Sequence, residues 1–113
     1  MKKKVVNKPW GFEEQFTLNE ISSVKILYVK PGRKLSLQKH KNRSEFWKVL
    51  ESVKVWIGNK KIEAIKGDEF MIKKGQLHRL EGLKKTGSVL EISFGKFDEN
   101  DIERIEDDYG RVK

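Results

Sequence analysis

The sequence predicts an all-β fold, a small antiparallel β-barrel or sandwich, from three observations. Apolar and polar residues alternate through the middle of the chain, as in "SVKILYV" and "EFWKVLE". β-Branched and aromatic side chains are frequent in these runs, and turn residues separate them about every 8 to 12 residues, as in antiparallel sheets. Helical periodicity is scarce, so we expect strands to carry the fold.

The expected strands fall in three regions, 23–40, 44–80 and 87–95. Each alternates with a period of two, and each is bounded or divided by a turn. Glycine supplies these turns because it reaches positive φ without a Cβ clash, and Asn and Asp tolerate the same conformation. The expected turns are Pro31-Gly32, Gly58-Asn59, Gly67-Asp68, Lys74-Gly75 and Gly87-Ser88.

The chain, 1–113, is expected to form one domain, because a chain of this length buries roughly two-thirds of its unfolded surface around a single core. Within it, 1–7 is a basic N-terminal extension and 98–113 an acidic C-terminal segment. The C-terminal segment is the one place where the sequence allows a helix, since Asp101 can cap it and Gly110 can end it.

Composition limits the ligands and the location. The 25 basic and 17 acidic residues give a net charge of +8, which suits a phosphorylated ligand or nucleic acid. Nucleic acid is disfavoured because no helix-turn-helix or RNP-like motif occurs. The lack of Cys excludes thiolate metal sites and favours an intracellular, cytoplasmic protein. Neither a signal peptide nor an apolar run of about 18 residues occurs, so we expect no membrane association.

Strand facing brings a set of possible metal ligands together. In "LSLQKH" the two leucines point one way, whereas Gln38 and His40 point the other. Glu45 begins the next expected strand in phase with its inward apolar residues, and His78 begins a strand after the turn at Gly75. Imidazole, carboxylate and amide oxygen are metal ligands. The alternative is that both histidines are ordinary surface or core residues and Glu45 is a surface acid.

The same residues carry a family resemblance. The stretch "GRKLSLQKHKNRSE" resembles the first cupin motif, G-x5-H-x-H-x4-E, with Gln38 in the first ligand place. The stretch "GDEFMIKKGQLH" resembles the second, G-x5-P-x-G-x-x-H, with Lys73 where proline is usual. Both histidines of the chain fall on motif positions.

A closer resemblance is to the C-terminal cupin domain of type II mannose-6-phosphate isomerases, many of which are fused to a mannose-1-phosphate guanylyltransferase. "KPWG" resembles that family's R-P-W-G, "LSLQKH" its L-S-L-Q-M-H, and "RSEFW" its R-A-E-H-W. "HRLEG" resembles its H-R-L-E-N, and "DIERIEDDYGR" its D-I-x-R-x-E-D-D-Y-G-R. The resemblance spans Lys8 to Arg111.

This resemblance implies a jelly-roll β-barrel in which Gln38, His40, Glu45 and His78 bind a divalent metal. Zn is the metal we expect, and Fe, Co, Ni or Mn also suit two imidazoles, a carboxylate and an amide oxygen. It further implies isomerisation of mannose 6-phosphate to fructose 6-phosphate, a homodimer, and a separate nucleotidyltransferase as a partner. The guanylyltransferase domain's Gly-rich motif is absent from the chain, so that activity is not expected of it.

Three arginines have two interpretations each. Arg43 matches the family's arginine between the metal ligands and is expected to be catalytic and to bind substrate, by neutralising an enediolate or holding a phosphate. Arg111, in the closing Y-G-R, is expected to return to the barrel mouth as a second phosphate ligand. The alternative for Arg43 is a solvated loop arginine, and the alternative for Arg111 is a frayed chain terminus. Arg79 lies next to His78, but alternation turns it away from the ligand face, which favours a solvated arginine there.

The chain also departs from the family. Lys41, Asn42 and Phe46 stand where the family typically has more histidines, so the metal ligands look intact while their imidazole surroundings are lost. Isomerisation needs a cation on two substrate oxygens and a base near neutral pH, and the sequence identifies no base. The rival hypothesis is therefore a metal-binding or sugar-binding cupin without turnover, serving as a dimeric accessory subunit to a nucleotidyltransferase.

Overall fold

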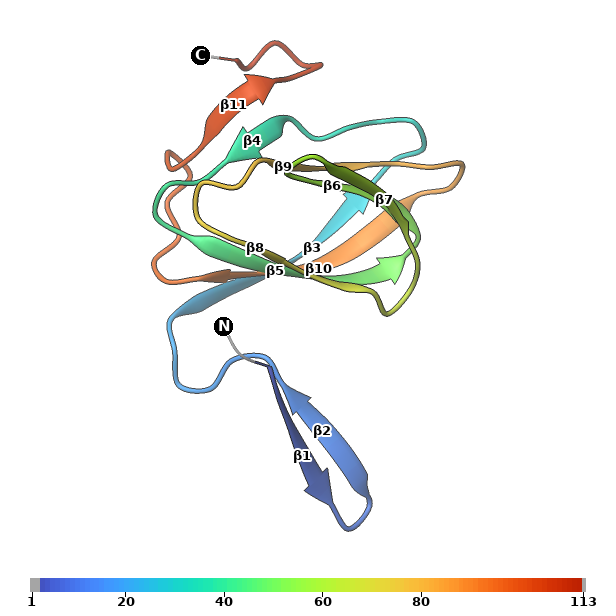
Figure 1. Ribbon diagram of the computed structural model, residues 1–113, viewed down its shortest axis with the longest axis vertical. Coiled ribbons are helices and arrows are strands. Elements are labelled where there is room, and N and C mark those ends of the chain that lie inside the picture. Colours follow the sequence, from blue (N-terminus) through green and yellow to red (C-terminus); the bar gives the residue numbers. More distant parts are fainter. Residues whose placement is uncertain (1–2, 113) are drawn as a thin grey trace.

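Strands make up the regular structure of the described part of this chain. The structure, a computed structural model, describes residues 3–112; residues 1, 2 and 113, which belong to the expected terminal segments, lie outside the described part. Figure 1 shows the strands in chain order. Their bounds are β1 Lys4–Lys8, β2 Gly11–Gln15, β3 Ser22–Val29, β4 Leu37–Lys39, β5 Ser44–Glu51, β6 Val53–Ile57, β7 Lys60–Ala64, β8 Glu69–Ile72, β9 His78–Glu81, β10 Gly87–Phe94 and β11 Glu103–Glu106.

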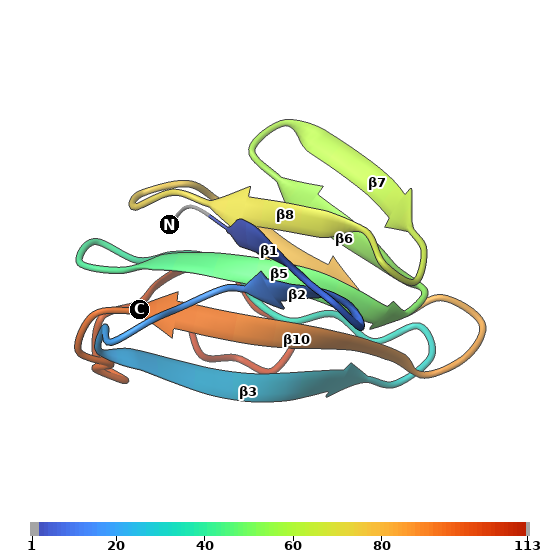
Figure 2. The ribbon, with the colours of Figure 1, turned by 90° about the horizontal axis from the view of Figure 1, so that it is seen from below.

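Two antiparallel sheets face each other and enclose the core. One has the strand order β3-β10-β5-β8 and the other β11-β4-β9-β6-β7. Figure 1 shows them as two layers, and Figure 2 shows the first sheet face-on, with β3, β10, β5 and β8 side by side. The all-β, antiparallel fold predicted from alternation is confirmed. Gly58, Gly67 and Gly75 take the positive φ values expected at their turns, 57°, 95° and 78°.

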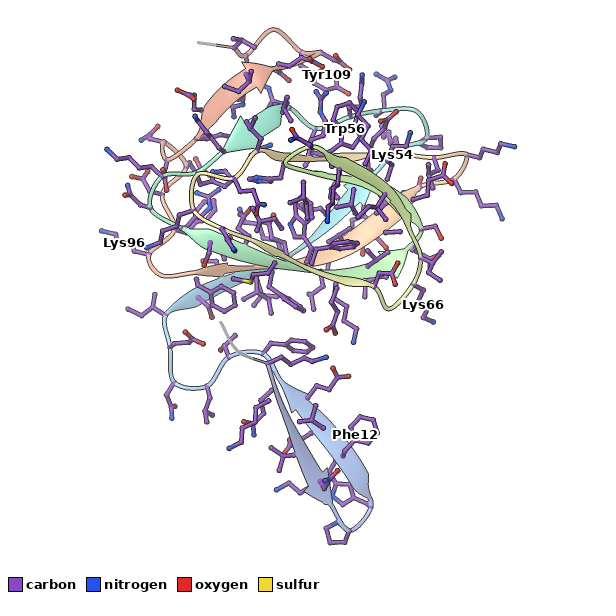
Figure 3. The ribbon with its side chains drawn as sticks, viewed as in Figure 1. Phe12, Lys54, Trp56, Lys66, Lys96 and Tyr109 are labelled. Carbon is purple, nitrogen blue, oxygen red and sulfur yellow. The ribbon has the colours of Figure 1, made fainter. Side chains whose placement is uncertain are left out.

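The core lies between the layers, where Figure 3 shows side chains from both sheets meeting. Strand β5 illustrates how alternation builds it: Glu45, Trp47 and Val49 are buried toward the interior. Phe46 faces the other side of the same strand and is covered by Phe16, with ring centroids 5.2 Å apart. The other core residues are Val29, Val53, Val55, Ala64, Ile72, Leu80 and Val89.

The hairpin β1-β2 extends away from the two layers (Figure 1). Strand β1 occupies most of the expected basic extension, and its residues pair with β2 from Lys4 opposite Gln15 to Lys8 opposite Gly11. Lys3 ties the hairpin to the barrel, because its ammonium group pairs with Glu14 at 2.7 Å and with Glu69 on β8 at 2.8 Å.

The C-terminal segment is a strand, so the helix that the sequence allowed there is wrong. Within the described residues 98–112, β11 pairs with β4 and extends the five-stranded sheet at its edge. Asp101 does not cap a helix; its carboxylate accepts the backbone N–H groups of Lys41 and Asn42 at 2.8 and 2.9 Å. Pairing with a distant strand therefore overrode a weak local helix signal. Among residues 3–112, no helix is long and apolar enough to cross a lipid bilayer.

Candidate metal centre

Three buried side chains from three parts of the barrel form a cluster. His40 follows β4, Glu45 lies on β5, and His78 begins β9. Their exposed fractions are 3%, 1% and 2%. One ligand atom from each lies within 4.8 Å of the other two, so the cluster could hold a metal ion. The convergence of these three residues, predicted from strand facing and motif spacing, is confirmed.

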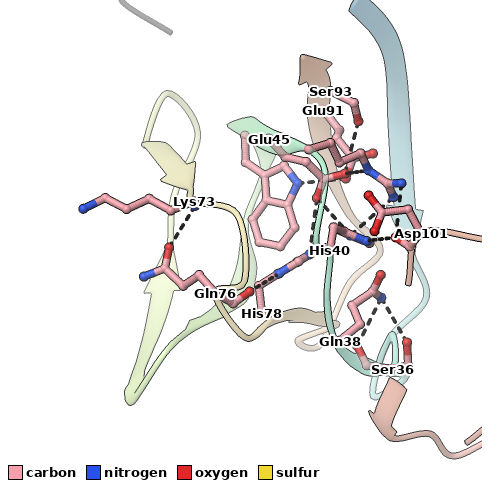
Figure 4. A network of polar contacts seen from close by, with 12 residues as sticks. Ser36, Gln38, His40, Glu45, Lys73, Gln76, His78, Glu91, Ser93 and Asp101 are labelled. Carbon is pink, nitrogen blue, oxygen red and sulfur yellow. Dashed lines mark hydrogen bonds and ion pairs between the residues drawn. The ribbon is translucent and has the colours of Figure 1, made fainter. Parts of the chain in front are cut away.

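Both imidazoles point at the same carboxylate oxygen (Figure 4). The Nε2 atom of His78 lies 3.2 Å from Oε1 of Glu45, and the Nε2 atom of His40 lies 3.5 Å from it. The two rings are close to each other, with centroids 4.9 Å apart. Trp47 closes one side of the cluster, its ring meeting His78 edge-on at 5.4 Å.

The surrounding hydrogen bonds fix the tautomer of each histidine. Nδ1 of His40 lies 2.7 Å from the carbonyl oxygen of Asp101, and Nδ1 of His78 lies 2.9 Å from that of Gln76. A carbonyl only accepts, so each Nδ1 carries a proton, and each Nε2 is left to present its lone pair to a metal ion. For His40 this is supported independently, because the donor-only guanidinium of Arg43 lies 3.3 Å from Nε2.

The carboxylate of Glu45 is held on one side and open on the other. Its Oε2 accepts from Nε of Arg43 at 3.2 Å and from Oγ of Ser93 at 3.1 Å. Its Oε1 is buried and has no hydrogen-bond partner among residues 3–112. The Nε2 atom of His78 and the anionic Oε1 thus face each other without a donor from another residue, an arrangement that a bound cation or a proton would satisfy. This donor set therefore fits a metal.

Electrostatics keep Glu45 ionised. Burial alone would raise the pKa of its carboxyl, but hydrogen bonds from His40 and His78, formed when their Nε2 atoms carry protons in place of a metal ion, outweigh burial and hold the pKa well below its usual range. A second buried carboxyl, Glu91, accepts from Nε1 of Trp47 at 3.0 Å. Burial, and then the charge of Glu45, raise the pKa of Glu91. The carboxyl that faces the imidazoles is thus favoured in its metal-binding form.

Gln38, the fourth expected ligand, lies beside the cluster. It is directly opposite His78 in the sheet, so the two side chains share a face. Its carboxamide nitrogen donates to the carbonyl oxygen and the hydroxyl of Ser36, at 3.2 and 3.0 Å (Figure 4). The role of Gln38 as a metal ligand stays a prediction.

The arginines lie in three different places. Arg43 is buried against the cluster and also donates to the carbonyl of Asp98 at 3.0 Å. Arg111 is instead paired with Asp107, Nε to Oδ2 at 2.9 Å, and lines a cavity of about 410 Å³ beside Tyr28 that contains none of the three cluster residues. The expected roles of both as substrate ligands stay predictions.

Arg79 corrects an expectation. Alternation turns it away from the ligand face, as expected, yet it is wholly buried and not solvated. Its Nε donates to the carbonyl of Leu35 at 2.8 Å, its Nη1 pairs with Glu106 at 2.7 Å, and it lies over the ring of Trp56 at 4.9 Å. The C-terminal strand supplies its ion-pair partner on the outer face of the sheet, and the ring of Trp56 lies against its guanidinium.

A cavity of about 420 Å³ gives access to His40. Its walls come from β4, the turn at Gly75 and the C-terminal segment, and Asp101 links them. Sequence reasoning missed the roles of Asp101, Ser93 and Glu91. The pattern carried no signal for Asp101, which acts across 61 residues, whereas Glu91 and Ser93 share a face by alternation in "VLEISF".

Comparisons with known proteins identify the family and agree with the fold. The family model described as mannose-6-phosphate isomerase C-terminal matches residues 1–107. The xanthan biosynthesis protein XanB of Xanthomonas campestris pv. campestris (strain B100) is 35% identical over 95% of this chain and 24% of its own length. The mannose-1-phosphate guanylyltransferase ManC of Salmonella typhimurium is 34% identical over 95% of this chain and 23% of its own.

Among solved structures, a protein with a double-stranded β-helix domain from Klebsiella pneumoniae subsp. pneumoniae has a TM-score of 0.60 at 19% identity, covering 82% of this chain and 75% of its own. A double-stranded β-barrel with a buried His and Glu cluster is a cupin, and the jelly-roll fold implied by the motifs is therefore confirmed. Within that class, the chain belongs to the mannose-6-phosphate isomerase C-terminal family. It spans about a quarter of the length of the relatives it matches.

Proposed function

We propose that this chain is a metal-dependent sugar-phosphate isomerase that interconverts mannose 6-phosphate and fructose 6-phosphate. One observation carries the proposal: two Nε2 lone pairs and the unpartnered Oε1 of Glu45 converge beside a cavity that reaches His40. The chain's membership of the mannose-6-phosphate isomerase C-terminal family supports this proposal.

Each residue of the cluster has a defined task. Arg43 and Ser93 hold Oε2 of Glu45, which leaves Oε1 directed at the histidines. A bound divalent cation would supply the positive charge that aldose-ketose isomerisation needs at two adjacent substrate oxygens. Because the amide nitrogen of Gln38 is engaged with Ser36, the carboxamide oxygen is the atom left to act as a fourth ligand. We propose Zn, with Fe, Co, Ni or Mn as alternatives, because borderline ligands suit all five metals.

The acids of the cavity differ in their suitability as a proton acceptor. Asp101 is a poor one near neutral pH, because the N–H groups of Lys41 and Asn42 hold its pKa below the usual range despite partial burial. Glu103 also lines the cavity and pairs with Lys39 at 3.1 Å. Glu103 is exposed, and its ion pair with Lys39 is weak at such a site, so Glu103 is the acid of this cavity that we propose can meet a substrate.

A rival function rests on the lost histidines. Of the three replaced positions, Lys41 and Asn42 lie next to the cluster, and their N–H groups are bonded to Asp101. Phe46 faces the opposite side of β5 against Phe16, so its replacement does not touch the ligands. The case for a cupin without turnover therefore rests on the replacements at Lys41 and Asn42 alone. In that function the chain would serve a separate nucleotidyltransferase, a class to which the similar protein ManC belongs.

The homodimer is also part of the proposal. Strand β3 is at the edge of its sheet and exposes Val24, Ile26 and Tyr28 along one face. Such an apolar stripe on an edge strand suits contact with a second copy. A cytoplasmic location, expected from the lack of cysteine, stays a prediction.

A coupled assay tests the isomerase against its rival. Protein is stripped with a chelator, reloaded with Zn and supplied with mannose 6-phosphate, and formation of fructose 6-phosphate is followed. We expect turnover that chelation abolishes and Zn restores, and that His78→Ala removes. Lys84→Ala, an exposed substitution lining a different cavity, is the matched control and should retain full rate. Metal binding with no turnover under any of the five metals would favour the non-catalytic cupin.

A further inference from the structure

Arg104 lies on the edge strand β11 and shares a face with the metal cluster. It is directly opposite Gln38, and Gln38 is directly opposite His78. Residues that face each other across neighbouring strands project to the same side of the sheet. The three side chains therefore form a row across three strands, from His78 in the cluster to Arg104 at the sheet edge.

The guanidinium of Arg104 has a donor that the chain does not use. Its Nε atom is buried, and within residues 3–112 it has no hydrogen-bond partner. Arg79 also leaves a buried nitrogen, Nη2, without a partner, but its Nη1 is paired with Glu106 on the outer face of the sheet, whereas Arg104 lines a cavity. A buried N–H without an acceptor is unfavourable, so a site that leaves one open calls for a ligand or water to accept from it.

A cavity of about 400 Å³ brings Arg104 and Arg43 together, with Asn100 as a third polar group. Asn100 and Ile102 also line the cavity that reaches His40, so the two cavities share a wall. Glu99 lines the same space, but it is exposed and free to turn into water. The space between the two arginines is therefore large enough for an anionic group and lies next to the cavity that reaches His40.

Metal loading would make Arg43 available to that anion. One N–H of its Nη2 lies 3.3 Å from Nε2 of His40. A single lone pair serves either this N–H or a metal ion, so loading the site takes the acceptor from Arg43 and leaves the donor to a ligand. The ring of Phe97, 4.5 Å away, keeps the guanidinium in place.

We infer that Arg104 and Arg43 form the phosphate subsite of this protein. Arg104 donates through its Nε–H and a terminal N–H to the phosphate of a phosphorylated sugar, the fork geometry that guanidinium offers to phosphate oxygens. The inference rests on the proposed function for its choice of a sugar phosphate as the ligand. It assigns the second phosphate cation to Arg104 and not to Arg111, which lines another cavity.

Calorimetry on Zn-loaded protein tests the subsite, with inorganic phosphate, mannose 6-phosphate and free mannose as probes at physiological ionic strength. Arg104→Gln should weaken binding of both phosphate probes roughly 10- to 100-fold, the value of a charge-assisted pair, and leave free mannose unchanged. Arg104→Lys keeps the charge but loses the fork, so affinity should fall several-fold. Arg33→Gln, the matched loss of an exposed charge in the Tyr28 cavity, should stay within about twofold.

Phosphate affinity of Arg104→Gln within twofold of wild type would overturn the inference, as would an equal loss for free mannose. Circular dichroism and Zn affinity verify that each variant folds. If Arg104→Gln does not fold, unchanged phosphate affinity in Arg104→Lys would refute the two-pronged contact between the Arg104 guanidinium and the phosphate. The two proposals fail separately. No turnover of mannose 6-phosphate, with phosphate binding still dependent on Arg104, would refute the isomerase and support the subsite. Turnover of mannose 6-phosphate by the wild type, with unchanged phosphate affinity in Arg104→Gln, would support the isomerase and refute the subsite.

Discussion

Removing the hydroxyl of Ser93 should loosen the metal centre without touching a metal ligand. Its Oγ donates to Oε2 of Glu45 at 3.1 Å, and both residues are almost fully buried. Ser93→Ala deletes this donor and leaves the carboxylate with Nε of Arg43, at 3.2 Å, on that side. Glu45 can then rotate, and its Oε1 loses its fixed direction toward the two histidines.

The size of the effect follows from the type of bond. A hydrogen bond to a charged group contributes about 1.5 to 3 kcal/mol. Because Arg43 still serves the same oxygen, we expect the lower part of this range, about 1.5 to 2 kcal/mol in the free energy of unfolding of the metal-free protein. For a chain of this size that lowers Tm by roughly 6 to 8 °C. Loss of a group that orients a metal ligand typically costs about 10-fold or more in metal affinity.

Thermal unfolding followed by circular dichroism measures the first effect, and competition with a chromophoric chelator measures Zn affinity. Ser88→Ala is the matched control, because Ser88 is buried on the same strand β10 and no side-chain hydrogen bond from it is found among residues 3–112. We expect Ser88→Ala to leave Zn affinity unchanged. Equal Tm and equal Zn affinity in the two variants would refute the role given to the Ser93 hydroxyl.

A methyl group at Gly82 would overlap the carbonyl of Lys30, so Gly82→Ala should lower the urea midpoint of unfolding. The drop should far exceed that of Gly95→Ala, where only backbone strain of about 1 to 3 kcal/mol applies at a φ of 92°. Similar midpoints for the two variants would contradict this. The guanidinium of Arg111 lowers the pKa of Asp107 to about 2, so in NMR titrations Arg111→Ala should raise it toward 3.8. Its stabilising effect is present above the ordinary pKa and lost as pH falls through about 2; an unchanged pKa would exclude the pair. Zn at 100 times its Kd should stabilise the protein by about 2.7 kcal/mol and chelation should reverse this, whereas no change in Tm would argue against the site.

Local pattern was enough to predict the barrel and the centre of the cluster. Alternation with a period of two fixes which face a side chain takes once a segment is extended, and that property needs no knowledge of the partner strand. His40, Glu45 and His78 could therefore be expected on one interior face, where they are found. The motif spacing added the family, since each histidine fell on a motif position. The fourth ligand, Gln38, is predicted on the same grounds and awaits a metal-binding test.

The arginines could not be placed in this way. Whether a guanidinium is solvated or buried depends on what packs over it, and for Arg79 that is Glu106 on a strand 27 residues away. Arg43 is buried for the same reason, because the C-terminal segment supplies the carbonyl groups that accept from it. Arg111 was expected at the barrel mouth but pairs with its neighbour Asp107, at another cavity.

The sequence by itself determined the fold class, the facing of each strand and three residues of the candidate metal centre, because these depend on spacing along the chain. The tertiary structure alone decided that 103–106 is a strand, that Asp101 fixes His40, and that Arg104 joins the row with Gln38 and His78. These features come from pairing between segments about 60 residues apart. The choice of strand partner is made by packing of the whole barrel, and no local pattern encodes it.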